Sequence, residues 1–412
     1  MRSLGDRLRG RCAAYLVGAG IFAASFLIFW LSNRYFEAGR GDLFYLADAF
    51  LHGRTWIEVM LGPYDVIPID GRIYVPFAPF PAIALMPFVA VVGSPVTADQ
   101  LESGVNAFLA ATAVLLAWIA TFRMGVRDLW DRLGLTIILG FSTAVWWVTT
   151  RGGVWHTGHL IAVILTLLLL IELYGARRPV LLGLLVGAAF LTRAPVIFAA
   201  PFVGLMLVAD WGPVLGRGRA LGDRVRALPW RTAALLVAGV APALLFFGWY
   251  NVARFGSITE SGYQLATLPA FLEALRQQGL FSVVHIPMNL HYLFTKLPDF
   301  IAQRPFFRPD GLGMSVFFTS PTLLLALRAD WRDARSRLLL ATAVAVLIPT
   351  LMYYGGGWFQ YGYRYFLDSI PFIWALCVLG VVKRGPIPTI GWVAIWWGVT
   401  VNAIGVYWAY NL

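Results

Sequence analysis

Long apolar stretches recur along the whole chain. Five of them contain no Asp, Glu, Lys or Arg at all: residues 12–33, 103–122, 133–150, 232–253 and 385–412. A bilayer core about 30 Å thick is crossed by roughly 20 apolar residues in a helix, so each stretch predicts a membrane span. We expect about eleven spans, at 12–32, 103–122, 133–150, 157–174, 179–192, 194–209, 232–253, 312–327, 338–354, 365–382 and 388–409.

The connections between these spans differ in length and charge. With the amino terminus in the cytoplasm, the short inner connections hold 20 of the 32 Lys and Arg residues, as the positive-inside rule requires. The carboxyl terminus then lies outside, together with the two long loops at 33–102 and 254–311. The apolar residues 80–93 are too short to cross and include two prolines, so we expect them to lie in the outer leaflet.

Amphipathic patterns in the two long loops predict short surface helices. Apolar positions recur at helical spacing in 43–51, 268–276 and 283–297. The predicted fold is therefore an all-α polytopic membrane protein with amphipathic interfacial helices in its first and fourth extracytoplasmic loops. We predict one domain over residues 1–412, without a separate soluble part.

Composition supports a membrane location and excludes several classes. Hydrophobic residues make up 59% of the chain and charged residues 13%, unlike a soluble globular domain. The net charge of +11 lies between apolar stretches rather than in one basic stripe, so we expect no nucleic-acid partner. The run that follows Met1–Arg11 predicts an uncleaved first span. We expect a bacterial-type plasma membrane, with the amino terminus cytoplasmic and the active site extracytoplasmic.

Asp42 is the first polar residue with a candidate chemical role. It stands where the amphipathic helix of the first loop begins. A carboxylate there either caps the helix, worth about 1 kcal/mol, or acts as a base beside a substrate carried by the membrane. Spacing alone favours the cap.

Several motifs resemble one family when they are taken in order. They are GDLFYLADAFLHGR (41–54), YVPFAPFPAIALMPF (74–88), VWHTGHLIAVILTLLLL (154–170), GLLVGAAFLTRAPVIFAAP (183–201), YNVARFGSITESGY (250–263), GLGMSVFFTSPTLLLAL (311–327) and GGGWFQYGYRYFLDSIPF (355–372). Over nearly its full length the chain resembles the GT-C superfamily of membrane glycosyltransferases. The resemblance implies a polyprenyl-phosphate-linked sugar as donor, an extracytoplasmic lipid, glycan or protein as acceptor, and Asp42 as general base.

A metal cofactor has little support in the first loop. Many members of the superfamily carry two adjacent acidic residues there, whereas this chain has Gly41-Asp42-Leu43 and its next carboxylate is Asp48. Six helical positions rotate Asp48 away from the face of Asp42. We therefore predict no certain cofactor and no metal ligands, although a divalent metal stays possible.

Arginines are the candidates for holding the leaving phosphate, because the guanidinium fork suits phosphate. Arg193 follows the short stretch 179–192 and precedes Pro195, so it should lie at a break between helices. It would bind an anion or pair with a carboxylate. Arg364 could pair with Asp368 four residues later or face phosphate. Arg151 is a further candidate and lies close to His156 and His159, at the outer end of the predicted span 157–174.

Other polar residues are weaker candidates for substrate contact. Two histidines three residues apart, His156 and His159, lack a third metal ligand, and His156 could hydrogen-bond to substrate or lie at the interface. Glu260 could bind the acceptor or be an ordinary loop acid. The remaining candidates are Tyr45, Asp48 and Tyr361, where the tyrosine rings could stack on a sugar or belong to an interfacial aromatic belt.

Two other functions compete with a glycosyltransferase. An O-antigen ligase or polymerase also uses outer arginines and a lipid pyrophosphate, and mutation of Asp42 would then matter little. A transporter or flippase would use a broken helix such as the one expected around Arg193. Most predicted spans lack the midplane charges that transport needs.

Overall fold

The structure is a computed structural model that describes residues 4–33, 40–208, 223, 226, 229–304, 306–357 and 359–410. Within these residues the chain is mostly helical. Six helices are long and apolar enough to cross a membrane, in agreement with a membrane-embedded protein. They are α1 (Leu4–Asn33), α5 (Glu102–Arg123), α8 (Val154–Leu173), α13 (Trp230–Phe255), α17 (Ala334–Met352) and α19 (Thr389–Tyr410).

Shorter segments stand where the sequence predicts the other spans. α6 (Leu129–Phe141) and α7 (Val145–Arg151) are bent by 42° at their junction and raise the count to seven if they form one span. The rest are α9 (Pro179–Phe190), η1 (Ala194–Ala199) with α10 (Ala200–Met206), α16 (Val316–Thr319) with η4 (Pro321–Arg328), and η5 (Arg364–Asp368) with α18 (Ile370–Arg384). Prolines and 3-10 turns interrupt most of these segments. By length and composition the described residues supply six or seven spans, not eleven.

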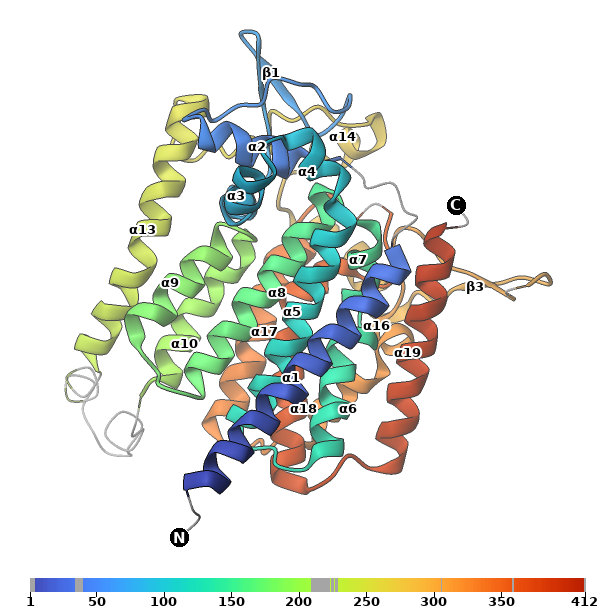
Figure 1. Ribbon diagram of the computed structural model, residues 1–412. Helices are drawn as coiled ribbons and strands as arrows, with labels where there is room; N and C mark the ends of the chain where they lie inside the picture. Colours follow the sequence, from blue (N-terminus) through green and yellow to red (C-terminus); the bar gives the residue numbers. More distant parts are fainter. Residues whose placement is uncertain are drawn as a thin grey trace.

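Short elements from both long loops gather at the top of the molecule in Figure 1. α2 (Asp42–Leu51) is the predicted amphipathic helix and packs on α3 (Phe80–Val92) and α4 (Pro95–Gln100). α14 (Ala270–Arg276) lies at the same end. The predicted segment 283–297 forms η2 (Val283–His285), α15 (Ile286–Leu290) and the π-helical η3 (His291–Thr295). α1 begins at the opposite, lower end, whereas α19 ends toward the top.

Two small hairpins depart from the all-helical prediction. β1 (Ile67–Ile69) pairs antiparallel with β2 (Arg72–Tyr74), and β3 (Asp299–Phe300) pairs with β4 (Phe307–Arg308). The first hairpin turns through Asp70 and Gly71, both with positive φ, at 48° and 74°. Asp-Gly is a preferred sequence for such a two-residue turn. The hairpin reverses the direction of the first long loop and projects from the top of the molecule in Figure 1.

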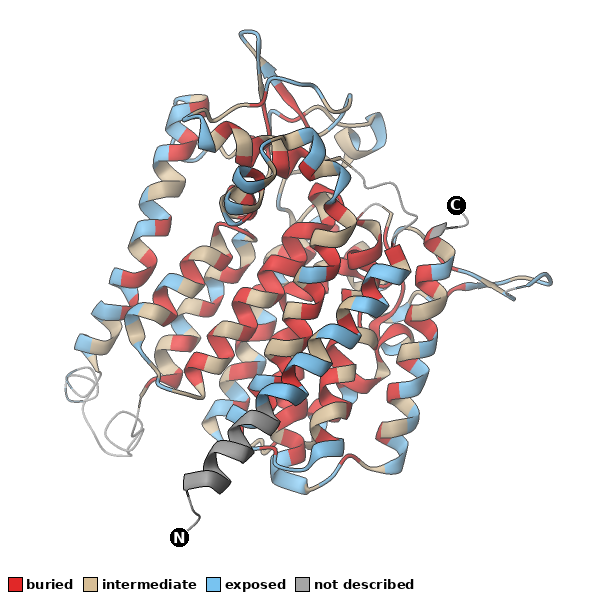
Figure 2. Ribbon diagram, viewed as in Figure 1, coloured by how far each residue is buried: buried red, intermediate tan, exposed pale blue. Residues whose placement is uncertain are grey.

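The core lies along α8, α5 and α18, which Figure 2 shows largely buried, while α1, α13 and α19 expose long faces. Trp147 and Trp374 are among the largest fully buried side chains, and the Trp374 indole donates to the Leu135 carbonyl over 2.8 Å. The exposed faces carry large apolar side chains such as Leu245 and Trp396. Apolar side chains on the outside of a bundle suit a lipid environment.

α9 and α13 touch through their backbones. A Cβ at Gly183 would lie 2.2 Å from the Leu236 carbonyl oxygen, and a Cβ at Gly239 would lie 2.3 Å from the Val180 carbonyl oxygen. Gly187, four residues after Gly183, likewise packs against Ala243. Small residues at this spacing let two membrane helices approach more closely than larger side chains allow.

Candidate functional site

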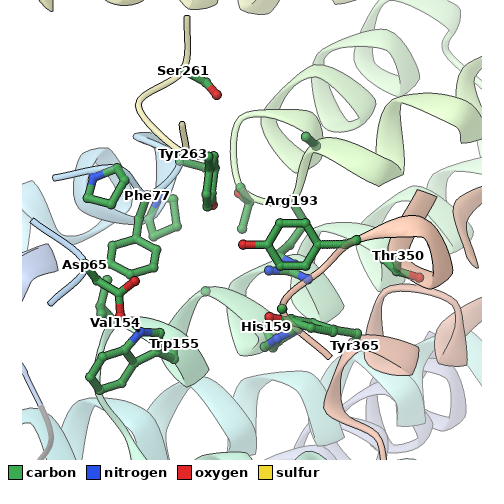
Figure 3. Close-up of a pocket in the computed structure, with 18 of the residues that line it drawn as sticks. Asp65, Phe77, Val154, Trp155, His159, Arg193, Ser261, Tyr263, Thr350 and Tyr365 are labelled. Carbon is green, nitrogen blue, oxygen red and sulfur yellow. Dashed lines mark hydrogen bonds between the residues drawn. The ribbon is translucent and has the colours of Figure 1, made fainter. Parts of the chain in front are cut away.

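Residues of both long loops and of the helices line a cavity of about 680 Å³ (Figure 3). Its walls come from the first long loop, α8, the break between α9 and η1, the end of α13, the second long loop and η5. Five arginines contribute to the lining: Arg40, Arg151, Arg193, Arg254 and Arg364. Aromatic rings and prolines form most of the remaining surface. Elements distant in sequence therefore converge on one large, positively charged site.

One wall is built around Asp65, a residue that the sequence analysis did not single out. Its carboxylate accepts a hydrogen bond from the Trp155 indole over 3.0 Å and lies beside Phe77 (Figure 3). Its backbone is left-handed, with φ 55°. The Asp65 amide donates to the Thr267 carbonyl, and the Thr267 amide donates to the Val66 carbonyl. A strained residue is thus held by hydrogen bonds between the two long loops.

Arg193 and Tyr365 lie across the cavity from Asp65 in Figure 3. The Arg193 Nε donates to both carboxylate oxygens of Asp368, over 3.1 and 3.0 Å. The His159 Nδ1 lies 3.4 Å from the same carboxylate, and the Arg193 guanidinium stacks over the Tyr365 ring. Asp368 is almost completely buried, whereas 21% of the Arg193 side chain is exposed. The outer part of the guanidinium is therefore available to an anion.

A second arginine is fixed by a histidine at the same end of the cavity. The Arg364 Nη1 lies 2.9 Å from the His156 Nε2, and the His156 Nδ1 lies 2.5 Å from the Gly152 carbonyl oxygen. Because Arg364 can only donate, the facing Nε2 of His156 is an acceptor and Nδ1 carries the proton. Arg151 stacks on Phe359, with 4.5 Å between the guanidinium carbon and the ring centroid.

A buried polar network holds the turn between α7 and α8. Gly152 and Gly153 both have positive φ, at 56° and 77°. One carboxyl oxygen of Glu102 accepts from the Gly153 amide over 2.8 Å and from the Thr157 hydroxyl over 3.0 Å. The Thr157 hydroxyl also lies 2.9 Å from the Asn106 side-chain oxygen. This network orients the turn from which Trp155 and His156 reach the cavity.

Asp42 lies behind the cavity wall. Its side chain is 0% exposed, and one carboxylate oxygen accepts from the Arg40 guanidinium over 2.5 Å. It is the first residue of α2 and not its N-cap, which is Gly41, so Asp42 does not cap the helix as predicted. Burial raises the pKa of Asp42, and the Arg40 charge opposes this. The Asp65 charge raises the pKa of Asp42 further. The pKa of Asp99 is raised mainly by burial and, in addition, by the Asp42 charge.

The structure brings four of the other predicted residues to the cavity: Arg151, His156, Arg193 and Arg364. The rest lie elsewhere. Asp48 is 3.5 Å from Arg54, and Glu260 accepts from the Gly262 amide over 2.6 Å. Tyr361 is fully buried and donates to the Val401 carbonyl over 2.6 Å, and Tyr45 packs among the apolar residues under α2.

The predicted ion pair between Arg364 and Asp368 is wrong. Residues 364–368 form a 3-10 helix, and Asp368 turns to Arg193 and His159 instead. Arg364 donates a hydrogen bond to His156 and does not pair with Asp368. The predicted break at Arg193 is confirmed, because α9 ends at Phe190 and η1 begins at Ala194.

Part of the cavity lining is apolar and aromatic. Phe190 and Phe247 line it from α9 and α13, and Phe281 lines it from the second long loop. Burial raises the pKa of Tyr263 to about 12, so its hydroxyl stays neutral at physiological pH. The site therefore combines an apolar surface with charged and hydrogen-bonding groups.

Among the residues that the structure describes, no group of three or more His, Cys, Asp or Glu side chains is arranged to hold a metal ion. In comparisons with protein families, curated proteins and solved structures, nothing matches this chain.

Proposed function

We propose that this protein is a membrane glycosyltransferase that moves a sugar from a polyprenyl-phosphate donor to an acceptor outside the cytoplasm. The observation that carries the proposal is the cavity, where Arg193 stands across from the Asp65 carboxylate and further arginines and aromatic rings contribute to the lining. Transfer from a sugar phosphate needs a base for the acceptor hydroxyl and positive charge for the departing phosphate. The resemblance to the GT-C superfamily supports the same reaction.

Arg193 and Arg364 are the proposed phosphate ligands. Arg193 keeps part of its guanidinium accessible while Asp368 fixes its orientation. Arg364 is held by a neutral histidine and forms no direct ion pair with a carboxylate among the described residues. Aromatic rings such as Tyr365 and Trp155 offer faces on which a sugar ring can stack. The first long loop supplies two candidate bases, the predicted Asp42 and the cavity-lining Asp65.

The orientation and the remaining spans belong to this proposal. We place the top segments of Figure 1 outside the cytoplasm and the arginine-rich connections inside, following the positive-inside rule. With α6 and α7 as one span, the four shorter segments named above would complete eleven spans. An odd number agrees with the placement of the start of α1 and the end of α19 at opposite ends of the bundle.

The test is sugar transfer by purified protein in detergent. Radiolabelled polyprenyl-phosphate hexoses and pentoses would be incubated with a panel of lipid, glycan and peptide acceptors, and both the glycosylated product and the released polyprenyl phosphate measured. Arg364→Gln should lower kcat/KM by about tenfold or more, since a charge-assisted contact to phosphate is worth about 1.5–3 kcal/mol. Arg72→Gln is the matched control, because Arg72 is exposed on the first hairpin and does not line the cavity.

The alternatives predict different results in the same preparation. A transporter, which the break at Arg193 would suit, moves labelled substrate into sealed vesicles without forming a covalent product. An envelope ligase or polymerase accepts a lipid pyrophosphate donor and tolerates substitution of the first-loop carboxylates. Absence of transfer by the wild type from every polyprenyl-phosphate sugar in the panel refutes the proposed glycosyltransferase.

A further inference from the structure

We infer that Asp65, and not Asp42, is the general base that deprotonates the acceptor; this inference rests on the proposed glycosyl transfer. Asp65 lines the cavity, while the Asp42 carboxylate is fully buried behind Arg40 and contributes nothing to the lining. A general base must come within hydrogen-bond reach of the proton that it removes. In this structure only one of the two carboxylates lies where an acceptor can meet it.

The Asp65 carboxylate has one oxygen fixed and one available. Oδ2 accepts the Trp155 indole hydrogen, which orients the group. Oδ1 has no hydrogen-bond partner within the part of the chain that the structure describes, and the side chain points toward the interior of the cavity in Figure 3. An oriented carboxylate with one uncommitted oxygen is suited to accept a proton from a hydroxyl group.

The backbone around Asp65 supports the same role. A φ of 55° is uncommon for a residue other than glycine. The conformation is maintained by Thr267, which makes backbone hydrogen bonds to Asp65 and Val66 and whose hydroxyl donates to the carbonyls of Pro63 and Val66. Strain that the surrounding structure over-determines is found at functional sites more often than elsewhere.

The position of Asp65 relative to the arginines fits an in-line displacement. Asp65 and Trp155 stand on one side of the cavity, and Arg193 stands on the other (Figure 3). The acceptor oxygen forms a bond to the anomeric carbon as its proton passes to Asp65 Oδ1. The bond between the anomeric carbon and the phosphate oxygen breaks, and the phosphate keeps the electron pair. Arg193 and Arg364 offset the negative charge that develops there. This geometry inverts the anomeric centre.

Asp42 then acts through Arg40 as a positioning residue. Arg40 binds the Asp42 carboxylate, donates to the Tyr64 carbonyl next to Asp65, and lies over the Trp155 ring at 5.6 Å. The Val154 amide also donates to the Arg40 carbonyl. Loss of the Asp42 charge would loosen Arg40 and shift the wall that carries Asp65, without removing the base.

The experiment compares Asp65→Asn, Asp42→Asn and Asp70→Asn in transfer assays with polyprenyl-phosphate sugars. Asp70 is the matched control because it is exposed in the same loop and also has a left-handed backbone, with φ 48°, which asparagine adopts readily. We expect Asp65→Asn to lower kcat by about 10²–10⁴-fold, the usual contribution of a general base. Asp42→Asn should lower it less than tenfold, and Asp70→Asn should match the wild type.

Binding of a sugar-free polyprenyl phosphate, followed by thermal shift, checks that each variant is folded and still holds the leaving group. A hundredfold loss in Asp42→Asn together with a loss below tenfold in Asp65→Asn overturns the inference and leaves the glycosyltransferase proposal intact. Equal hundredfold losses in both variants also overturn it, because Asp42 would then be more than a positioning residue. If the wild type transfers no sugar, both the proposed glycosyltransferase function and the inference about Asp65 are refuted.

Discussion

Replacing Asp368 by Asn should destabilise the protein more than any other removal of a single charge in the cavity wall. The Asp368 carboxylate is 1% exposed and accepts two hydrogen bonds from Arg193, over 3.1 and 3.0 Å. His159, also 1% exposed, lies 3.4 Å away. Asparagine keeps the shape but leaves Arg193 without a negative partner, close to Arg364. Removing one partner of a buried ion pair costs about 3–5 kcal/mol.

The partial exposure of Arg193 reduces the loss of stability that we expect from Asp368→Asn. Because 21% of its side chain is exposed, water can solvate part of the unpaired guanidinium, so we expect about 3 kcal/mol, the lower end of the range. The free energy of unfolding would be measured by titration with denaturing detergent in mixed micelles. Asp330→Asn is the matched control, since Asp330 forms an exposed pair with Lys383 over 2.7 Å, and exposed pairs contribute little.

A double-mutant cycle isolates the interaction itself. Arg193→Gln and the double variant with Asp368→Asn should show a coupling energy above about 1 kcal/mol, within the range found for residues in one buried network. A loss below about 1 kcal/mol in Asp368→Asn, with no coupling to Arg193, would refute the argument. It would mean that the buried charges are stabilised by something other than each other.

Three further outcomes follow from the structure. Gly152→Ala should cost more than 2 kcal/mol of unfolding free energy, because φ is 56° and the new Cβ would lie 2.8 Å from Asn106; Gly71→Ala, with similar φ but open space, isolates the backbone cost. Tyr361→Phe should lose about 0.5–1.5 kcal/mol, the usual net contribution of one hydrogen bond, with kcat/KM unchanged; a large loss of activity would restore the predicted substrate contact. Burial raises the pKa of Asp65 above its usual 3.8, so the rate of transfer should begin to decrease at a higher pH than for an ordinary carboxylate when the pH is lowered. The same shift means that ionisation of Asp65 destabilises the folded state, so the free energy of unfolding of the wild type should decrease relative to that of Asp65→Asn as the pH rises from 4 to 7.

The sequence predicted features that depend on local pattern. The break at Arg193 follows from a stretch too short for a bilayer and a proline two residues later. The amphipathic α2 follows from helical spacing. Contacts between distant segments could not be predicted, because nothing in the residues around Arg364 indicates a partner 208 positions away at His156. The intrahelical pair expected for Asp368 was wrong for the same reason.

Asp65 was missed because its importance comes from the fold. It is a single acid in a loop, without a repeated pattern around it. Its left-handed backbone and its contact with Trp155 arise only once the first long loop meets α8 and Thr267. The Gly62-Pro63 pair before it and the Asp70-Gly71 turn after it did indicate a sharply folded loop. Isolated polar residues in loops with such turn signals should therefore be considered as candidate site residues.

The glycines between α9 and α13 act as spacers that set the width of the cavity from a distance. Phe190 and Phe247 face each other across these two helices, with their ring centroids 5.1 Å apart. A methyl group at Gly183 or Gly239 would push the backbones apart, because its nearest neighbours are backbone atoms that cannot rotate away. In the proposed glycosyltransferase, the shape available to the lipid end of the donor would therefore be set by residues that the donor does not touch. Variation at these two positions would then alter the proposed lipid preference without any change in the proposed base or phosphate ligands.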